Sequence, residues 1–280
     1  MAVLLLGYDV ETQDPDAPVT KQFLEVATRV HSEMEAPGTF FLCGRTVENN
    51  TDAIIETQKT GLFDYQSHTY SHVLFKCLWQ VNEEGERLVR SGSIEQIAEE
   101  VDRANTVLRE RLGVTVTGLT TPWGYYRGLG DRPDLLAILH GNGIRFLRSW
   151  ARNEKDWVPN PLEVQPFFYE CQGFPDMLEF PMTGRHDCDW SRSLGFEPRE
   201  FKDVHDFAEY LAGQLEIIAE NDWAWPNNQH DHSTMKHDPE MVVIRRLIEK
   251  ARELGMQVAL YRDYYDQRMA EKQVTAGPES

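Results

Sequence analysis

The sequence has few cysteines, no long apolar run and a shortage of positive charge. Of 280 residues, four are cysteines, and no two of them form a CxxC pair, so a disulfide framework or cysteine-rich zinc module is not indicated. No run approaches the roughly 18 apolar residues of a membrane span. The 28 basic residues face 46 acidic ones, a net charge of −18. Without a basic stripe, such a chain is repelled by nucleic acid and by anionic membranes, so we expect neither partner.

The start of the sequence is not expected to be an export signal. The apolar opening has no basic flank and runs directly into Tyr8-Asp9-Val10-Glu11, which favours a buried strand over a signal peptide. We therefore expect a cytoplasmic protein with free thiols. Low-complexity linkers and internal repeats are missing as well, which predicts one domain over residues 1–272 and a loose tail over 273–280.

Apolar patterning alternates between two periods along the chain. Continuous apolar runs predict buried strands at residues 3–8, 39–43, 62–66, 116–120, 144–150, 177–182, around 223 and at 256–260. Helical spacing lies between them, with Thr20 as the expected cap of the first helix and Ser93 and Gly113 as the ends of a later one. Sustained strand–helix alternation indicates parallel strands. We predict an α/β fold, a distorted (β/α) barrel of about seven parallel strands.

Chemically capable residues follow the predicted strands. Acids follow the first strand, histidines the third, and further polar and aromatic groups the later strands: Asp9, Glu11, His68, His72, Pro122, Trp123, Gly124, Arg185, His186, Asp187, His230, Asp231 and His232. In a parallel barrel the carboxyl ends of all strands share one rim, where such folds place their sites. The sequence therefore predicts a site at this rim.

His68 and His72 are spaced as a candidate metal pair. Two imidazoles four residues apart can chelate a cation from a helix or from a loop, although two surface histidines would give the same pattern. Asp9 and Glu11 stand at i and i+2, so an extended chain would point both carboxylates to the same side. One could bind a metal and the other take a proton; a turn or helix-cap acid pair is the alternative.

These motifs resemble the polysaccharide deacetylase family, carbohydrate esterase family 4. The segments similar to the family's five motifs occur in its order: Tyr8-Asp9-Val10-Glu11, His68-Thr69-Tyr70-Ser71-His72, Thr120-Thr121-Pro122-Trp123-Gly124, Asn153-Glu154-Lys155-Asp156-Trp157 and Gln229-His230-Asp231. Between the first two, Gly38-Thr39-Phe40-Phe41-Leu42-Cys43-Gly44 is similar to a strand segment of the family. The spaced acid pair is typical of a branch that includes members resembling cyclic imidases and allantoinases. The second of the family's five motifs, the histidine pair, is the most specific.

The resemblance implies a role for each matching residue. Asp9 would be the general base and Glu11, His68 and His72 the metal ligands. The general acid would be His230, with His232 as its competitor. Substrate contacts are expected from the third and fourth motifs, at Pro122, Trp123, Gly124 and Trp157; core packing is the alternative for any single aromatic residue.

Three positions depart from the family pattern. Thr120 stands where the family has the arginine that orients the base, and Asn153 replaces an acid. Val10 replaces the metal-binding aspartate that most members carry beside the base, which is why Glu11 is expected to bind instead. Arg127 or Arg148 could supply the missing guanidinium, and the sequence leaves this choice open. Residues 74–92 resemble an insertion near the rim, a lid or a partner contact.

The predicted function is hydrolysis of a non-peptide C–N bond that depends on a divalent metal. Imidazole and carboxylate ligands favour zinc, and cobalt, nickel and iron are also compatible. The first hypothesis is deacetylation of an N-acetylated sugar; the second is opening of a small cyclic imide or ureide; the third is a non-catalytic sugar-binding protein. We expect a small-molecule or oligosaccharide substrate. The oligomeric state, including a homo-oligomer, stays open.

Overall fold

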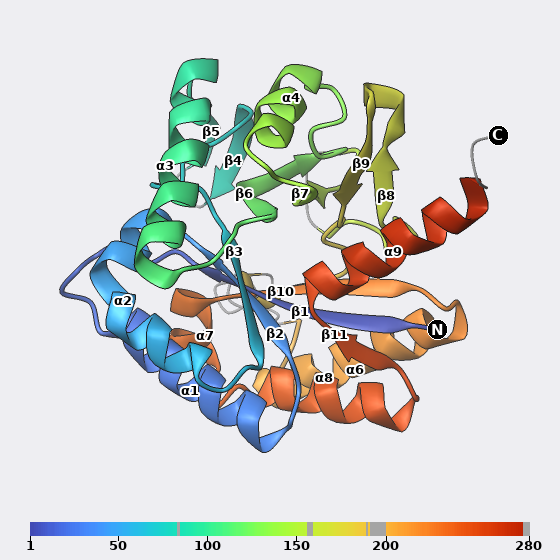
Figure 1. The fold of residues 1–280 in the computed structure, drawn as a ribbon. Coiled ribbons are helices and arrows are strands. Elements are labelled where there is room, and N and C mark those ends of the chain that lie inside the picture. Colours follow the sequence, from blue (N-terminus) through green and yellow to red (C-terminus); the bar gives the residue numbers. More distant parts are fainter. Residues whose placement is uncertain (83–84, 156–158, 189, 191–199, 277–280) are drawn as a thin grey trace.

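The structure, a computed structural model, describes residues 1–82, 85–155, 159–188, 190 and 200–276 (Figure 1). The strands are β1 (Val3–Val10), β2 (Gly38–Leu42), β3 (Phe63–Ser67), β4 (Leu78–Asn82), β5 (Gly85–Val89), β6 (Gly118–Tyr126), β7 (Phe146–Arg152), β8 (Phe167–Tyr169), β9 (Phe174–Glu179), β10 (Ala224–His230) and β11 (Gln257–Ala259). The helices are α1 (Val19–Glu33), α2 (Gly44–Gln58), α3 (Ile94–Leu112), α4 (Pro133–Gly141), the short η1 (Glu170–Gln172), α6 (Val204–Glu220), α7 (Asp231–His237), α8 (Val242–Glu253) and α9 (Tyr261–Ala276). None of the helices in these ranges has the length and apolar character that a bilayer crossing needs.

Seven parallel strands form the wall of the barrel. Their order is β10-β1-β2-β3-β6-β7-β9, with the antiparallel β8 beyond β9. The short β11 pairs with the first half of β1, and β2 pairs with its second half. Within the described ranges β10 and β8 end this path, so the barrel is distorted and open between them. The predicted α/β barrel of about seven parallel strands is confirmed.

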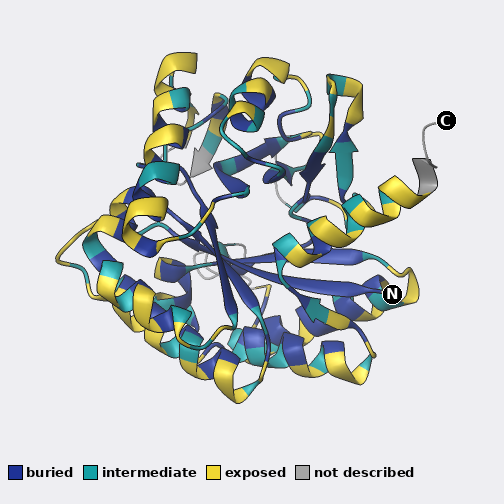
Figure 2. Cartoon of the chain, in the orientation of Figure 1, coloured by how far each residue is buried: buried dark blue, intermediate teal, exposed yellow. Residues whose placement is uncertain are grey.

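Strand β1 shows how the two faces of the sheet divide. Leu4, Leu6 and Tyr8 belong to the larger core cluster, between the sheet and the surrounding helices. Val3 and Leu5 face the opposite way, into a smaller cluster that fills the barrel. Because side chains alternate along a strand, Gly7 and Asp9 continue this interior face. Figure 2 shows the inner strands as buried and the outer helix faces as exposed.

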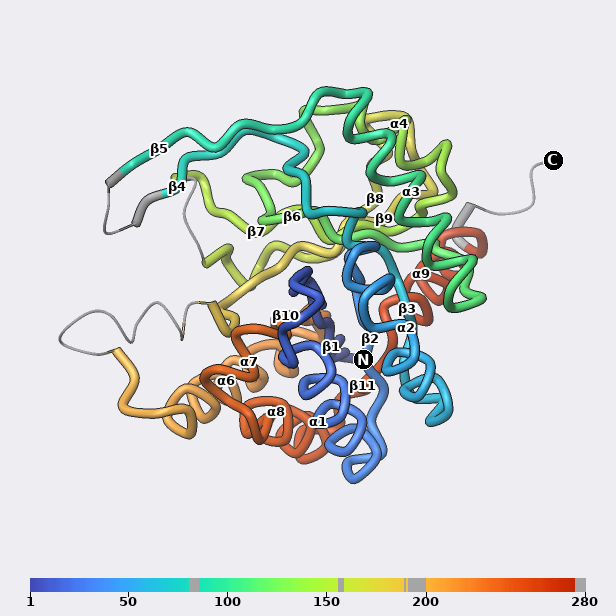
Figure 3. Tube along the Cα trace, turned by 90° about the vertical axis from the view of Figure 1, so that its left-hand side faces the viewer, coloured from blue at the N-terminus to red at the C-terminus, as the bar shows by residue number. Residues whose placement is uncertain are grey.

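Helix α9 closes one end of the barrel. Tyr261 lies in the interior cluster, with ring centroids 5.2 Å from Phe41 and 5.0 Å from Phe180. Figure 3 shows α9 and the β4–β5 hairpin on opposite sides of the molecule. Arg262 of α9 pairs with Asp64, near the start of β3, at 2.9 Å. Helix α9 therefore covers the amino ends of the strands, and their carboxyl ends form the mouth of the barrel. Helix α9 also continues four residues into the predicted loose tail, to Ala276.

Helix α3 has the ends that the sequence predicted. The Ser93 hydroxyl accepts the Gln96 N–H at 3.2 Å, and Gly113 ends the helix in a left-handed conformation with φ of 69°. Its stripe of Ile97, Val101 and Leu108 is fully buried against the core, as expected for an amphipathic helix.

Two local predictions need correction. Thr20 does not cap α1, because the helix begins at Val19 after Pro18 and the Thr20 hydroxyl instead donates to Asp231 at 2.8 Å. The fourth predicted strand is longer than residues 116–120. Strand β6 runs to Tyr126, and its register against β7 shifts between Thr120 and Tyr125. Pro122, Trp123 and Gly124 therefore lie within an irregular part of a strand rather than after it.

The segment expected to be an insertion forms the β4–β5 hairpin. The Gly92 N–H donates to the Leu74 carbonyl at 2.9 Å and closes the base of the hairpin. Trp79 and Leu88 are directly opposed across its two strands and are 54% and 45% exposed.

A buried histidine in α1 should make folding sensitive to acid. His31 is fully buried; its Nδ1 lies 2.7 Å from the Ala36 carbonyl and its Nε2 2.6 Å from the Tyr8 hydroxyl. Burial lowers the pKa of His31 from 6.5 to about 4. The unfolded chain therefore binds the proton first as the pH falls, so stability is complete above pH 6.5 and is lost toward pH 4. We expect His31 to account for about 3 kcal/mol of this loss.

Urea unfolding of wild type and His31→Gln at pH 7 and pH 4 measures this contribution. The variant should lose less free energy of unfolding between the two values, and the matched variant of the exposed His205, His205→Gln, should behave like wild type. Equal pH dependence in wild type and His31→Gln would contradict the prediction.

Candidate metal and catalytic site

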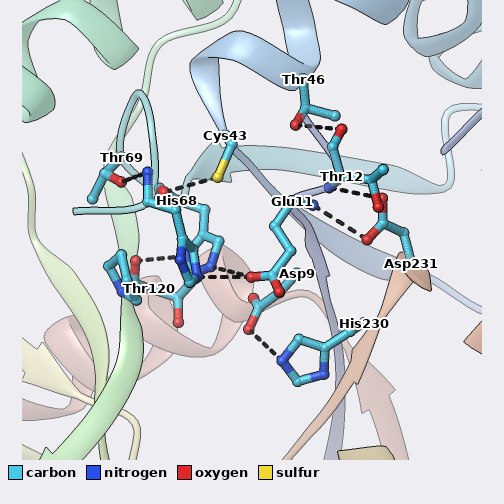
Figure 4. A network of polar contacts seen from close by, with 12 residues as sticks. Asp9, Glu11, Thr12, Cys43, Thr46, His68, Thr69, Thr120, His230 and Asp231 are labelled. Carbon is cyan, nitrogen blue, oxygen red and sulfur yellow. Dashed lines mark hydrogen bonds and ion pairs between the residues drawn. The ribbon is translucent and has the colours of Figure 1, made fainter. Parts of the chain in front are cut away.

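The carboxyl ends of β1, β3 and β10 bring the predicted site residues together. Strand β1 pairs in parallel with β10, with Asp9 opposite His230. Strand β2 lies between β1 and β3, and the loop after β3 carries His68 and His72. Figure 4 shows Glu11 between the histidine side of the site and Asp9, with His230 beyond Asp9.

Glu11, His68 and His72 form a compact set of three potential ligands. The Glu11 Oε2 atom lies 3.0 Å from His68 Nε2 and 2.9 Å from His72 Nε2. His68 is buried, and its Nδ1 is 3.0 Å from the Thr120 carbonyl, so Nδ1–H donates there and Nε2 is the nitrogen that faces Glu11. Without a metal Nε2–H donates to Glu11, and once Nε2 releases this proton the ring is the tautomer that a metal-binding imidazole requires. The donor set, two imidazole nitrogens and one carboxylate, fits a divalent transition metal with open positions.

A strained turn, rather than a helix, brings the two histidines together. Thr69 and His72 have positive φ values of 63° and 65°, which non-glycine residues adopt rarely. The Thr69 hydroxyl accepts the His72 N–H at 3.1 Å, and the Glu100 carboxylate accepts both the Ser71 N–H and its hydroxyl at 2.6 Å. The imidazole rings meet edge to face, 4.9 Å apart. Backbone strain held in this way is typical of a functional site.

In the metal-free protein, Glu11 and the two histidines, His68 and His72, stabilise each other's charged forms; these three residues are called the triad below. Burial alone would raise the pKa of Glu11, but hydrogen bonds from His68 and His72 hold it well below the usual value. Burial alone would lower the pKa of His68, but the negative charges of Asp9 and Glu11 outweigh burial, so the pKa of His68 is raised. The triad therefore favours an ionised carboxylate.

Asp9 is held by two side chains from neighbouring strands. The Arg148 Nη2 donates to Asp9 Oδ1, and the Asn228 Nδ2 donates to Oδ2 at 3.1 Å. Arg148 is buried on β7, directly opposite Thr120 on β6, and its Nε donates to the Thr120 hydroxyl at 3.2 Å. Arg127 is exposed and lies over the ring of Tyr126. Of the two arginines that the sequence left open, Arg148 is the one that contacts Asp9.

Gly7 makes room for this arginine inside the barrel. A Cβ atom at Gly7 would lie 2.6 Å from Arg148 Nη1 and 3.0 Å from the Tyr261 hydroxyl, closer than real contacts allow. The guanidinium carbon also lies 4.6 Å from the ring centre of Phe41. Gly7 is two residues before Asp9 and on the same face of β1. Because it has no side chain, the Arg148 guanidinium can reach the Asp9 carboxylate.

His230 is the histidine beside Asp9. Its Nε2 lies 3.7 Å from Asp9 Oδ2, and its Nδ1 and backbone N–H contact the two oxygens of Asp187 at 2.8 and 2.7 Å. Burial alone would lower the pKa of His230, but the Asp187 carboxylate raises it well above the usual value. The competitor His232 is 49% exposed, and its Nδ1 is 3.6 Å from Glu11 Oε1.

Asp231 connects the end of β10 to the loop that carries Glu11 through hydrogen bonds. It is fully buried and accepts the Glu11 N–H at 3.4 Å, the Thr12 N–H at 3.2 Å and the Thr20 hydroxyl at 2.8 Å. Because Asp231 directly follows His230, one strand end positions both the Glu11 loop and the neighbouring imidazole.

The predicted substrate contacts are less defined. Pro122 and Gly124 are buried, with the Pro122 carbonyl accepting the Tyr125 hydroxyl at 2.9 Å. Trp123 is half-buried, has a positive φ of 69° and packs against the larger core cluster. Trp157 lies outside the described residues. Substrate binding by these four residues stays a prediction.

Several groups around the site had no role in the sequence interpretation. Asp187 and Asp231 were placed on the rim without a function, and Asn228 and Cys188 were not considered for one. The alternation of β10 could have indicated Asn228, because it is two residues before His230 and on the same face. His186, which the sequence also places on the rim, is buried.

The first part of the chain is similar to a known protein family. Residues 8–130 match the model of the polysaccharide deacetylase family, which confirms the resemblance that the motifs predicted. At a coarse level the match indicates a hydrolytic enzyme of the deacetylase type. No curated protein matches the sequence.

Solved structures share the fold at low sequence identity. A candidate polysaccharide deacetylase from Mycobacterium smegmatis is 15% identical, with a TM-score of 0.65 over 96% of this chain and 91% of its own. Puue allantoinase is 14% identical, with a TM-score of 0.68 over 99% and 92%. A carbohydrate esterase family 4 pseudoenzyme from Bacillus anthracis is 13% identical, with a TM-score of 0.56 over 94% and 65%. At these identities the likeness shows the fold alone.

Proposed function

We propose that this chain, whose residues 8–130 match the polysaccharide deacetylase family, is a metal-dependent hydrolase of non-peptide C–N bonds. N-acetylated sugars are the first substrate class. The observation that carries the proposal is the order of groups across the mouth of the barrel: a three-ligand set, then Asp9, then His230 at 3.7 Å from Asp9. Hydrolysis of an amide needs a base on one side of the carbon and an acid near the nitrogen.

The metal would be held by Glu11 Oε2 and by the Nε2 atoms of His68 and His72. When bound, it supplies the Lewis acidity that polarises an amide carbonyl and makes water acidic enough to react. Zinc is the favoured cation, and cobalt, nickel and iron suit the same donors.

The chain's own residues move the two protons. Asp9 accepts a proton from the attacking water, and Arg148 and Asn228 hold its carboxylate in place. His230 donates a proton from Nε2 to the leaving nitrogen, because an amine leaves poorly unless it is protonated. Asp187 fixes the His230 ring through Nδ1–H, so that Nε2 faces Asp9.

A cyclic imide or ureide is the second candidate substrate class. The allantoinase fold covers 99% of this chain, and the acids of this chain, Asp9 and Glu11, are spaced as in the imidase-like branch that the sequence resembles. The same base, acid and ligand set would open a ring amide. Thr120 in place of an arginine favoured a non-catalytic sugar-binding protein, but Arg148 supplies a guanidinium at Asp9, which argues against that hypothesis.

Metal analysis together with two product assays tests the proposal. Purified protein should contain about one divalent metal per chain, and with N-acetylglucosamine oligomers it should release acetate. Ring opening of hydantoin or succinimide is measured in parallel. Acetate release supports the sugar class, and ring opening alone replaces it with the second class. A metal-loaded protein that turns over neither would contradict the hydrolase, as would hydrolysis by metal-free protein.

A further inference from the structure

A second group of ligand atoms lies on the far side of His230. His230 Nδ1 is 2.8 Å from Asp187 Oδ1 and 3.5 Å from Cys188 Sγ. His186 Nδ1 is 3.6 Å from Asp187 Oδ1 and accepts the Cys188 N–H at 3.3 Å. One ligand atom from each of these four residues lies within 4.8 Å of the other three.

The composition of this group differs from that of the first site. It contains a thiol sulfur, a carboxylate and two imidazoles, all in buried or half-buried positions. Four protein donors of this kind complete a tetrahedral zinc coordination and leave no position for water or substrate. A thiolate also selects softer cations such as zinc, cobalt and cadmium over magnesium or manganese. The first triad, with three protein donors and no sulfur, has the open character of a catalytic site.

We propose that His186, Asp187, Cys188 and His230 form a second site for a soft divalent cation, which inhibits the enzyme by binding His230 through Nδ1. The inhibitory part rests on the proposed function, in which His230 is the general acid. A cation on Nδ1 replaces the proton that His230 donates to Asp187 and prevents the doubly protonated imidazolium from forming. The ring then has no readily released proton for the leaving nitrogen. The ligands of the first ion, Glu11, His68 and His72, are not affected, so excess metal would inhibit the enzyme without displacing the first ion.

Cobalt binding separates the two sites. Metal-free protein is titrated with Co²⁺, and bound metal is counted by dialysis while the near-ultraviolet thiolate-to-cobalt charge-transfer band is recorded. Wild type should bind two ions and show the band. His68→Ala should bind one ion and keep the band, whereas Cys188→Ser should bind one ion without it. Retention of the first ion in Cys188→Ser also shows that this variant is folded.

Cys77→Ser is the matched control. Cys77 is exposed on the β4–β5 side of the molecule, so this variant should bind two ions and keep the band. One ion per wild-type chain would overturn the proposal. So would a band that persists in Cys188→Ser, because the thiolate would then be another cysteine, such as the buried Cys43.

The activity arm uses zinc beyond the first equivalent. Loss of a general acid lowers hydrolysis by about 10²- to 10⁴-fold, and we expect this inhibition in wild type and Cys77→Ser, with cadmium acting at lower concentration than manganese. The rate of hydrolysis by Cys188→Ser should not change when zinc is added beyond the first equivalent. Two bound ions with undiminished hydrolysis would overturn the inhibitory role. Because the cobalt counts need no substrate, failure to find any turnover would reject the proposed function while still deciding whether the second site exists.

Discussion

Asp9→Asn should lower kcat by about 10²- to 10⁴-fold, the usual contribution of a positioned base, and should leave about one metal per chain. The amide has nearly the same shape as the carboxylate but cannot take a proton from water. Metal should stay because the Asp9 oxygens contact Arg148 and Asn228, whereas the ligand set consists of Glu11, His68 and His72. Turnover and metal content are measured on the same preparation.

His68→Ala is the counterpart of this variant. It removes a ligand, so it should lose both the catalytic metal and turnover, and added zinc should not restore the rate at micromolar concentrations. Second-site metal is counted separately through the cobalt band. Loss of the catalytic metal from Asp9→Asn would show that Asp9 is itself a ligand, and would exchange the proposed roles of Asp9 and Glu11.

Arg148→Ala should lower both kcat and stability. Removing one partner of a buried ion pair leaves an uncompensated charge and costs about 3–5 kcal/mol, since Arg148 and Asp9 are both buried. The kcat should fall with little change in KM, because the guanidinium contacts the base rather than the substrate. Added guanidinium ions should restore part of kcat, a rescue that a purely structural role would not produce.

Two further variants connect this effect to the architecture of the barrel. Gly7→Ala should reproduce part of the Arg148→Ala defect, because the new methyl group would meet Arg148 Nη1. Gly213→Ala in α6 is the matched control, since a Cβ there meets nothing within 4 Å. If Gly7→Ala and Gly213→Ala behave alike, Arg148 does not depend on the space at Gly7.

The double variant that combines Thr120→Arg with Arg148→Thr should recover activity, because the two positions are opposite each other in β6 and β7.

Much of the site's layout could be predicted because it depends on local periodicity. Asp9 and Glu11 are separated by one residue, so a strand direction is enough to place both carboxylates on one side. His68 and His72 belong to one short turn. The carboxyl ends of parallel strands must meet, which brings His230 to Asp9 once the strands are recognised.

Contacts between strands distant in sequence were not predictable in this way. Arg148 and Asp9 are 139 positions apart, and nothing in the local pattern around Arg148 distinguishes it from Arg127. The choice depends on which side chain faces the barrel interior and on the room that Gly7 leaves there. The contact between Asp187 and His230 likewise needs the segment that follows β9 to approach the end of β10.

The sequence by itself determined the alternation of strands and helices, the parallel barrel and the side of the sheet to which each acid points, because these follow from patterns over a few residues. Only the tertiary structure decided which arginine accompanies Asp9 and which groups surround His230. Those contacts depend on register and on free volume between strands, and neither is encoded in the spacing of any one segment.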